Sequence, residues 1–257
     1  ADFDAASRQL VLFEGMPDPS IRFHLARIIA RLECDAEIGA LTADERLTTE
    51  TAMQRARGAL ERYVAAAILF PYETFLASAI ELRDDRSPGQ RLRLARRFGG
   101  SFEQICHRLV SLKCPGAEGI PFAFMRVDAA GNISKRFSLP NLRLPRYRES
   151  CAYWAAFEAF ATPDRVVTQR AEMPTGAKFL MAARTVTRPA FGYGIPSARF
   201  SVMIACDIVY RDRIVYGDGL GADLPSLTTL VGTTCRLCPR AGCQQRAQAP
   251  IVPALST

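Results

Sequence analysis

Three cysteines stand close together near the C-terminus, in the stretch CRLCPRAGC, as Cys235, Cys238 and Cys243. Cys235 and Cys238 have the spacing that lets both sulfurs reach one metal from a tight turn. Pro239 and Gly242 favour a folded loop over a helix or a strand. Three thiolates in one short loop predict a metal centre, either zinc or a [4Fe–4S] cluster. The alternative is three unrelated buried cysteines.

Either metal centre requires a fourth ligand. The chain has only two histidines, His24 and His107, and both fall in its helical first part, so a fourth cysteine is the better candidate. Cys151 and Cys206 lie in the same part of the chain as the loop. The sequence does not choose between these two cysteines.

The bulk properties are typical of a cytoplasmic globular protein with an anionic partner. The first ten residues, ADFDAASRQL, lack the basic start and apolar core of a signal peptide, and the apolar run over 63–70 is too short to cross a bilayer. In a reducing compartment, clustered cysteines are metal ligands more often than disulfides. The net charge of +7 suits nucleic acid or a phosphate-bearing ligand, although a generic basic surface would also account for it.

The elements that must position the cysteines fall into two parts. The first 115 or so residues predict helices, over 18–33, 49–70, 71–83 and, around Gly99-Gly100, two short ones within 92–112. Asp18 is the predicted N-cap of the first helix, and Ser101 with Gln104 predicts a capping box for the last. The buried face of the first helix is predicted from apolar residues at spacings of three and four: Ile21, Leu25, Ile28 and Leu32.

The second part predicts strands. One hairpin is expected over 121–139 and another over 165–186, with a helix near 153–160 between them. Further strands are expected over 198–210 and 213–220, and the cysteine loop follows them. We therefore expect an α+β fold with two domains, 1–116 and 117–257, the second built on an antiparallel sheet.

Several longer stretches together resemble one family. They are RFHLARIIARLE, RYVAAAILFPYETFLASAIELR, RRFGGSFEQICHRLVSLKCPGAEGIPFAFMRVDAAGNISKR, CAYWAAFEAF, the strand ending in Ala205-Cys206-Asp207, VYGDGL and CRLCPRAGCQQRAQAP. In these motifs the chain resembles the sensing region of the short-chain fatty acyl-CoA responsive transcription regulators. This family includes bacterial regulators of propionate catabolism and of the glyoxylate bypass.

The resemblance implies a fold, two ligands and a set of partners. The first domain is similar to a metallopeptidase-like domain, and the family carries a helix-turn-helix DNA-binding domain ahead of this region, which we expect to lie outside this chain. Related members hold an iron–sulfur cluster on cysteines that match Cys235, Cys238 and Cys243. We accordingly expect a short-chain acyl-CoA effector, promoter DNA bound through the missing domain, a homodimer and no membrane association.

The peptidase motif itself is absent. Related peptidases carry His-Glu-x-x-His on a helix, where two imidazoles one turn apart bind zinc and the glutamate acts as base. The matching positions here are Arg27, Ile28 and Arg31. Guanidinium groups do not bind zinc, and isoleucine cannot accept a proton. No Gly-x-Ser-x-Gly motif is present either, so we expect a sensor rather than an enzyme.

An acyl-CoA needs a small apolar pocket, an aromatic surface for adenine and cations for its phosphates. We expect the pocket in the helical domain, beside the former peptidase cleft, although each aromatic residue could equally be plain core. The predicted ligand-contacting residues are Arg22, Phe23, Tyr63, Tyr72, Phe75, Arg108, Lys135 and Arg136.

Two other functions fit parts of the sequence. The stretch LARRFGGSFEQICHRL resembles a helix-turn-helix that would point Gln104 and Arg108 into a DNA groove. A zinc-stapled interaction domain with no small ligand would also explain the cysteine loop.

Overall fold

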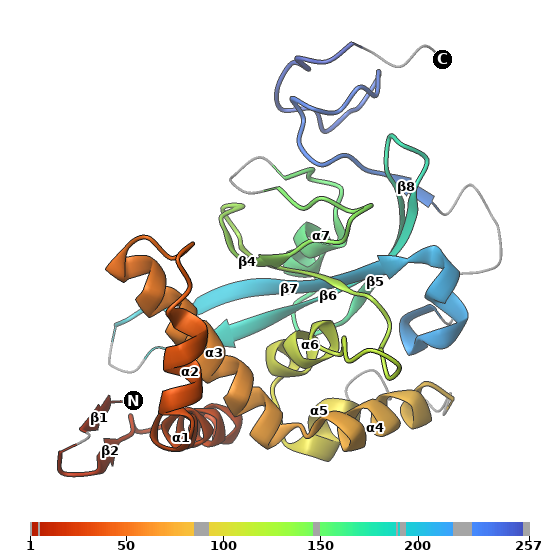
Figure 1. The fold of residues 1–257 in the computed structure, drawn as a ribbon. Helices are drawn as coiled ribbons and strands as arrows, with labels where there is room; N and C mark the ends of the chain where they lie inside the picture. The colour runs from red at the N-terminus through yellow and green to blue at the C-terminus, as the bar shows by residue number, and fades with distance from the viewer. Residues whose placement is uncertain are drawn as a thin grey trace.

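The computed structural model describes residues 2–4, 6–84, 93–145, 150–188, 190, 194–217 and 228–253. The first part of the chain is helical, as predicted (Figure 1). It also has a small N-terminal hairpin and a second helix that the sequence did not predict. Its elements are β1 (Asp2–Asp4), β2 (Gln9–Val11), α1 (Asp18–Glu33), α2 (Asp35–Thr42), α3 (Glu50–Leu69), α4 (Tyr72–Asp84), α5 (Arg93–Phe98) and α6 (Phe102–Val110).

Helix α1 packs through a different face from the one predicted. Ala26 and Ala30 are its fully buried residues, whereas Leu25 and Leu32 are 45% and 53% exposed. The prediction was wrong because α1 packs against α3, and small alanine side chains let two helices lie close together. Asp18 is also not the N-cap, since Pro17 occupies that position and Asp18 lies in the first turn.

Two capping motifs mark where helices α3 and α6 begin. The Thr49 hydroxyl accepts a 3.1 Å hydrogen bond from the backbone N–H of Ala52 and caps α3. At α6 the predicted capping box of Ser101 and Gln104 is confirmed. The Gln104 side chain also donates to the Pro19 carbonyl over 3.0 Å, so it ties the start of α6 to the start of α1.

The second part is built on a six-stranded sheet with the order β4-β3-β7-β6-β5-β8. All pairs are antiparallel except β5 with β8, so the predicted fold class is confirmed. The elements are β3 (Ala123–Asp128), β4 (Ile133–Phe137), α7 (Ala155–Ala161), β5 (Val167–Glu172), β6 (Lys178–Arg188), β7 (Ala198–Asp207), η2 (Ile208–Arg213), η3 (Val215–Gly217) and β8 (Thr228–Leu230).

The strand predicted over 213–220 is not present in its described residues. Two 3₁₀-helices, η2 and η3, occupy 208–213 and 215–217, and the remainder of the predicted strand lies outside the described residues. Asp207 starts the first of them, because its carboxylate accepts a hydrogen bond from the Val209 N–H over 3.1 Å. This cap turns the chain away from the sheet as soon as β7 ends.

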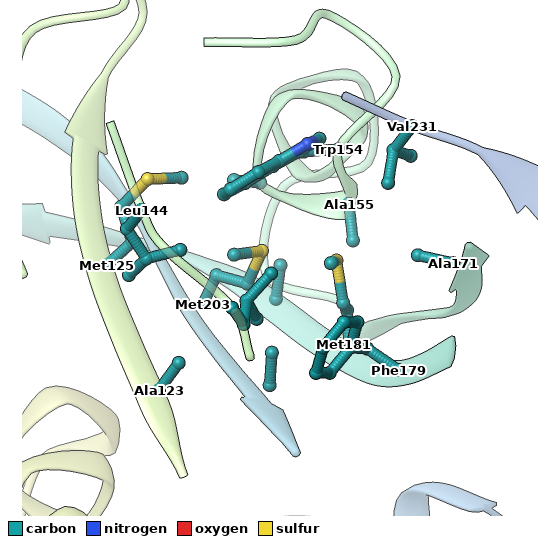
Figure 2. Packing of buried hydrophobic residues seen from close by; sticks show 14 of the residues in the cluster. Ala123, Met125, Leu144, Trp154, Ala155, Ala171, Phe179, Met181, Met203 and Val231 are labelled. Carbon is teal, nitrogen blue, oxygen red and sulfur yellow. The ribbon is translucent and has the colours of Figure 1, made fainter. Parts of the chain in front are cut away.

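The two faces of the sheet bury two separate cores. On one face, Trp154 and α7 pack over Met125, Met181 and Met203 (Figure 2). The Trp154 indole N–H donates to the Gly232 carbonyl over 2.7 Å, so this core is tied to the segment that leads into the cysteine loop. On the other face, α6 and the two 3₁₀-helices cover the alternate residues of the same strands.

Within the described part of the chain, no single helix has the length and apolar composition needed to cross a bilayer. One pair, α3 with α4, meets those criteria only jointly and is bent by 64°.

Candidate metal centre and ligand pocket

The cysteine loop follows β8 and projects beyond that end of the sheet (Figure 1). Cys235, Cys238, Cys243 and Cys151 line one small pocket of about 20 Å³. The Cys238 side chain is buried, and the other three are half-buried. The structure thus brings the three predicted cysteines together and adds a fourth from a segment more than eighty residues earlier.

Arg246 holds the loop closed. Its guanidinium donates hydrogen bonds to the carbonyl oxygens of Cys235 over 2.9 Å and of Cys238 over 3.1 Å, and a further one to the Arg240 carbonyl. One side chain therefore supplies hydrogen bonds to several carbonyl groups of an irregular loop that is not part of a helix or a sheet. Arg240 in turn donates to the Glu172 carbonyl, which fastens the loop to the end of β5.

The two candidates for a fourth ligand lie in different places. The Cys151 backbone N–H donates to the Thr233 carbonyl over 3.2 Å, which holds the residue beside the loop. Cys206 lies in β7 within the core under α6, where burial raises the pKa of its thiol to about 12. Burial also raises the pKa of the Cys151 thiol. Only Cys151 shares the pocket with the loop cysteines.

The residues of this pocket fit a metal centre by donor chemistry. Thiolates are the preferred ligands of zinc and of iron–sulfur clusters. Among the described residues, however, no three Cys, His, Asp or Glu side chains are arranged to hold a single metal ion. A lone zinc with Zn–S bonds of about 2.3 Å would need its sulfurs within about 4 Å of one another. The described cysteines are thus not placed for a single zinc ion, while their sulfur donors suit an iron–sulfur cluster.

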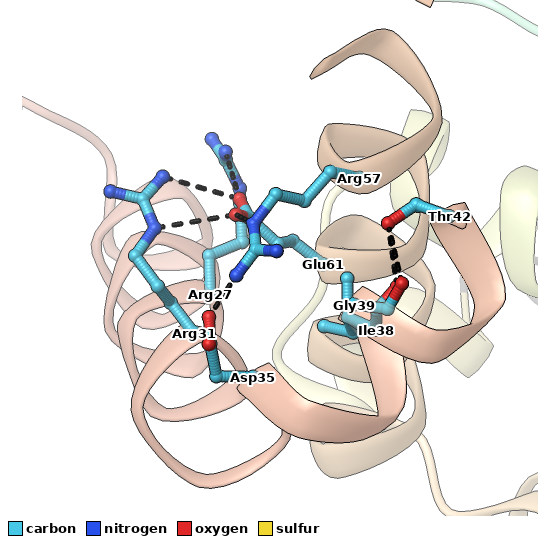
Figure 3. A network of polar contacts seen from close by, with 8 residues as sticks. All are labelled: Arg27, Arg31, Asp35, Ile38, Gly39, Thr42, Arg57 and Glu61. Atoms are coloured by element: carbon cyan, nitrogen blue, oxygen red, sulfur yellow. Dashed lines mark hydrogen bonds and ion pairs between the residues drawn. The ribbon is translucent and has the colours of Figure 1, made fainter. Parts of the chain in front are cut away.

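An ion-pair cluster occupies the positions of α1 that match the peptidase motif (Figure 3). Arg27 and Arg31 of α1 both bond the carboxylate of Glu61 in α3, over 2.9 and 3.2 Å, and Arg57 approaches it to 4.0 Å. The Glu61 side chain is only 5% exposed. Burial alone would raise its pKa, but the hydrogen bonds from Arg31 and Arg27 outweigh this and lower it. Two arginines thus neutralise a carboxylate where the peptidases would hold zinc.

Some of the residues predicted to contact acyl-CoA are built into the core. Arg108 is 1% exposed, donates to the Phe70 carbonyl over 2.8 Å and lies over the Tyr72 ring. Phe75 is fully buried. The Tyr72 hydroxyl donates to the Ala117 carbonyl and accepts from the Cys114 N–H, both in the segment that follows α6. In this conformation Tyr72, Phe75 and Arg108 are part of the packed core, and the Arg108 guanidinium bonds the Phe70 carbonyl instead of a phosphate.

Tyr63, Arg22 and Phe23 lie nearer the surface. Tyr63 is 52% exposed on α3. Arg22 is exposed and lies over Gly99, where a Cβ would come within 2.4 Å of its guanidinium, and Phe23 is half-buried beside it in α1. Glycine is favoured at the α5–α6 turn because Gly99 has a positive φ, a conformation that other residues adopt only at a cost.

Lys135 and Arg136 point to opposite faces of the sheet. Lys135 binds the Glu103 carboxylate over 2.8 Å, together with Arg126 at the same distance. Arg136 donates to the Leu144 carbonyl on the other face. The two cations cannot hold one phosphate together, because neighbouring residues of a strand alternate between faces.

The helix-turn-helix interpretation of the α5–α6 segment is not supported. Helix α6 is covered on several sides, and Phe102, Ile105, Cys106 and Arg108 are all buried. Gln104 is already bonded to Ser101 and to Pro19. A recognition helix needs an open face for the major groove, which α6 does not have here.

The molecule is thus a helical peptidase-like unit with its metal site replaced by arginines, joined to an α+β unit that carries a cysteine pocket. A family model for the short-chain fatty acyl coenzyme A regulator C-terminal region matches residues 111–257. A model for the IrrE N-terminal-like domain of M78 peptidases matches residues 1–110. The chain belongs to the short-chain fatty acyl coenzyme A regulator family, and the resemblance inferred from its motifs is confirmed.

Individual relatives agree with this assignment. The chain is 38% identical over 233 residues to the propionyl-CoA carboxylase regulator of Cereibacter sphaeroides, covering 91% of this chain and 49% of that protein. It is 40% identical over 226 residues to the HTH-type transcriptional regulator PrpR of Mycobacterium tuberculosis, covering 88% of this chain and 45% of that protein. A solved Mycobacterium tuberculosis transcriptional regulator superposes with a TM-score of 0.88 at 34% identity, over 100% of this chain and 76% of that one.

The chain spans about half the length of the curated relatives it matches. The relatives named above are named as regulators, in agreement with the expectation that this chain is not an enzyme. The division at residues 116 and 117 stays a prediction.

Proposed function

We propose that this chain is the ligand-sensing region of a transcription regulator that binds short-chain acyl-CoA and a [4Fe–4S] cluster to control genes of short-chain fatty acid metabolism. The family description and the names of its relatives support the regulatory role. Promoter DNA would be bound by a domain outside this chain, in a cytoplasmic homodimer.

The observation that carries the cluster proposal is the pocket lined by four cysteines. Cys235, Cys238 and Cys243 would supply three thiolates from the loop, and Cys151 the fourth from the other side. When bound, the cluster supplies a redox-active crosslink between these segments. The chain's own contribution is positional, since Arg246 and Arg240 hold the loop carbonyls and fasten the loop to β5.

Anaerobic purification tests the cluster and its ligands together. We expect brown protein with absorbance near 400 nm and about four irons and four sulfides per chain. Cys151→Ala should lower the iron content strongly, whereas Cys206→Ala, which removes a core thiol outside the pocket, should leave it unchanged. Colourless protein with one zinc per chain would refute the cluster, and full iron in Cys151→Ala would refute the fourth ligand.

The acyl-CoA would bind against the helical part, at the members of the predicted set that lie there: Arg22, Phe23, Tyr63, Tyr72, Phe75 and Arg108. Arg22 and Tyr63 are the exposed members and would make the first contacts, while Tyr72, Phe75 and Arg108 would form the wall behind them. Calorimetric titration with propionyl-CoA should show weaker binding by Arg22→Ala. Arg46→Ala, which removes an exposed arginine paired with Asp44, is the matched control.

A further inference from the structure

Helix α1 carries an apolar stripe on an exposed face. Leu25, Ile29 and Leu32 form this stripe and are 45%, 48% and 53% exposed. The fully buried Ala26 and Ala30 lie on a different side of the helix, against α3. The helix itself lies at the lower edge of the molecule, with α2 and α3 above it (Figure 1). The large apolar side chains of α1 are thus in solvent, while its alanines are in the core.

The spacing within the stripe is that of a seam between two helices. Leu25 and Ile29 are four residues apart, and Ile29 and Leu32 are three apart. Steps of four and three repeat every seven residues, and this period keeps apolar side chains facing one partner helix along its length. A single exposed apolar residue is ordinary, but a continuous group of them marks an interaction surface.

Opposite charges at the two ends of the stripe indicate what covers it. Arg22 precedes Leu25 and Glu33 follows Leu32, and both charged side chains are exposed. The two positions differ by eleven residues, so they lie about 16 Å apart along the helix and cannot pair within one chain. At 100° per residue they fall about 20° apart around the axis, on the same flank of the stripe.

An antiparallel second copy of α1 satisfies the apolar stripe and the charges together. With a twofold axis beside Ile29, Leu25 of one copy meets Leu32 of the partner subunit, and the two Ile29 side chains meet each other. Arg22 then comes level with Glu33 of the partner subunit to within about 3 Å along the helix. A parallel pair would instead place Arg22 opposite Arg22 and Glu33 opposite Glu33, and like charges oppose such a pairing.

We propose that the α1 stripe is the contact surface for a second copy of this chain, in an antiparallel helix pair with twofold symmetry. The inference rests on the homodimer of the proposed function and adds its surface and its register. A 16-residue helix is about 24 Å long and 10–12 Å wide. One pair of such helices buries less than the about 1,200 Å² of a stable interface, so we expect a Kd in the micromolar range.

Sedimentation equilibrium of the whole chain over a range of concentrations tests the surface. The wild type should dimerise, and Ile29→Glu should raise the dimer Kd about tenfold or more, because it places two like charges beside the twofold axis. Val209→Glu is the matched control, since it charges an apolar side chain of η2 that is 71% exposed, and it should dimerise like the wild type. Leu25→Glu replaces Ile29→Glu if circular dichroism shows that the latter does not fold.

An exchange of charges tests the orientation. Arg22→Glu should raise the dimer Kd about two- to tenfold, because it faces Glu33 of the partner subunit with a like charge in two exposed pairs. Adding Glu33→Arg should return the Kd to the wild-type value. This rescue requires contact between two copies, because the two positions are too far apart to pair in one helix.

The outcomes separate this inference from the proposed function. An unaltered dimer Kd in Ile29→Glu and Leu25→Glu would overturn the surface and leave the homodimer standing. A charge exchange without rescue would overturn the antiparallel register. A wild-type chain that stays monomeric at every concentration would overturn the whole inference. Iron content and propionyl-CoA titration decide the proposed function separately, and Ile29→Glu should leave both unchanged.

Discussion

Glutamine in place of Glu61 removes the charge at the centre of the arginine cluster that joins α1 to α3. In the wild type the carboxylate accepts hydrogen bonds from Arg27 over 2.9 Å and from Arg31 over 3.3 and 3.2 Å. Glutamine has nearly the same shape, but its NH₂ group would face guanidinium donors. The substitution therefore tests the electrostatic role of the cluster with little change in packing.

The expected loss of stability follows from the exposure of the partners. Removing one member of a buried ion pair costs about 3–5 kcal/mol, because the other charge is left without a partner. Here the Arg27 and Arg31 side chains are 28% and 48% exposed, so they can turn partly towards water. We expect Glu61→Gln to lower the free energy of unfolding by about 2–3 kcal/mol, discounted for this exposure. For a chain of this size that corresponds to a midpoint about 4–12 °C lower.

The pH dependence gives a second, independent readout. The folded-state pKa of Glu61 lies below its unfolded value, so its stabilisation is present above the unfolded pKa of about 4.3 and is lost as the pH falls through the folded-state value. The difference between wild type and Glu61→Gln should accordingly be full at pH 7 and shrink below about pH 4.

Thermal and urea unfolding, followed by circular dichroism across this pH range, measures both effects. Glu50→Gln, at the exposed start of the same helix, is the matched control and should shift the midpoint only slightly. A Glu61→Gln midpoint equal to that of Glu50→Gln at pH 7 would refute the reasoning. So would a difference from wild type that stays constant down to pH 3.

Three further changes probe the sites. Restoring the peptidase pattern at α1 should create a zinc site with Glu61 as third protein ligand, measurable as one bound zinc per chain that Glu61→Gln removes. That triple variant is Arg27→His, Ile28→Glu, Arg31→His. Gly232→Ala should speed the loss of iron to a chelator, because the new Cβ would lie 2.9 Å from the Cys238 sulfur; unaltered kinetics would contradict this. Trp154→Phe should cost about 1–3 kcal/mol in urea unfolding, since it leaves the buried Gly232 carbonyl without its donor; a loss below about 0.5 kcal/mol would argue against that bond.

Local sequence signals predicted the elements where the cause of the structure is itself local. The capping box at Ser101 and Gln104, the hairpin over 121–139 and the helix over 49–70 all depend on neighbouring residues, and all were predicted correctly. The buried face of α1 was predicted incorrectly because it depends on a partner helix. The large apolar residues suggested one face, and close packing against α3 selected the alanines instead.

For the candidate sites, too, the residues with a local sequence signal were predicted and those that depend on distant partners were not. The loop cysteines were found because a metal site on one short loop leaves its spacing in the sequence. Cys151 was one of two open candidates, and the pairing of its backbone with Thr233 and its place in the loop pocket distinguish it from Cys206. The importance of Glu61 was missed, because Arg27 and Arg31 lie 34 and 30 residues away in the sequence and a glutamate inside an amphipathic helix gives no local signal.

An apolar cavity of about 120 Å³ lies between the helical part and one face of the sheet, the core around Trp154 lies against the other face, and β7 contributes to both. Ile204 of β7 lines the apolar cavity, while its neighbours Met203 and Ala205 pack into the core around Trp154. Trp154 in turn bonds the Gly232 carbonyl, and the Cα of Gly232 lies against the Cys238 side chain. A shift of β7 would therefore reach the cysteine loop through packed atoms and one hydrogen bond. Coupling between effector and cluster requires a ligand preference for one arrangement of these contacts, and that preference can be measured as a difference in acyl-CoA affinity between cluster-loaded and cluster-free protein.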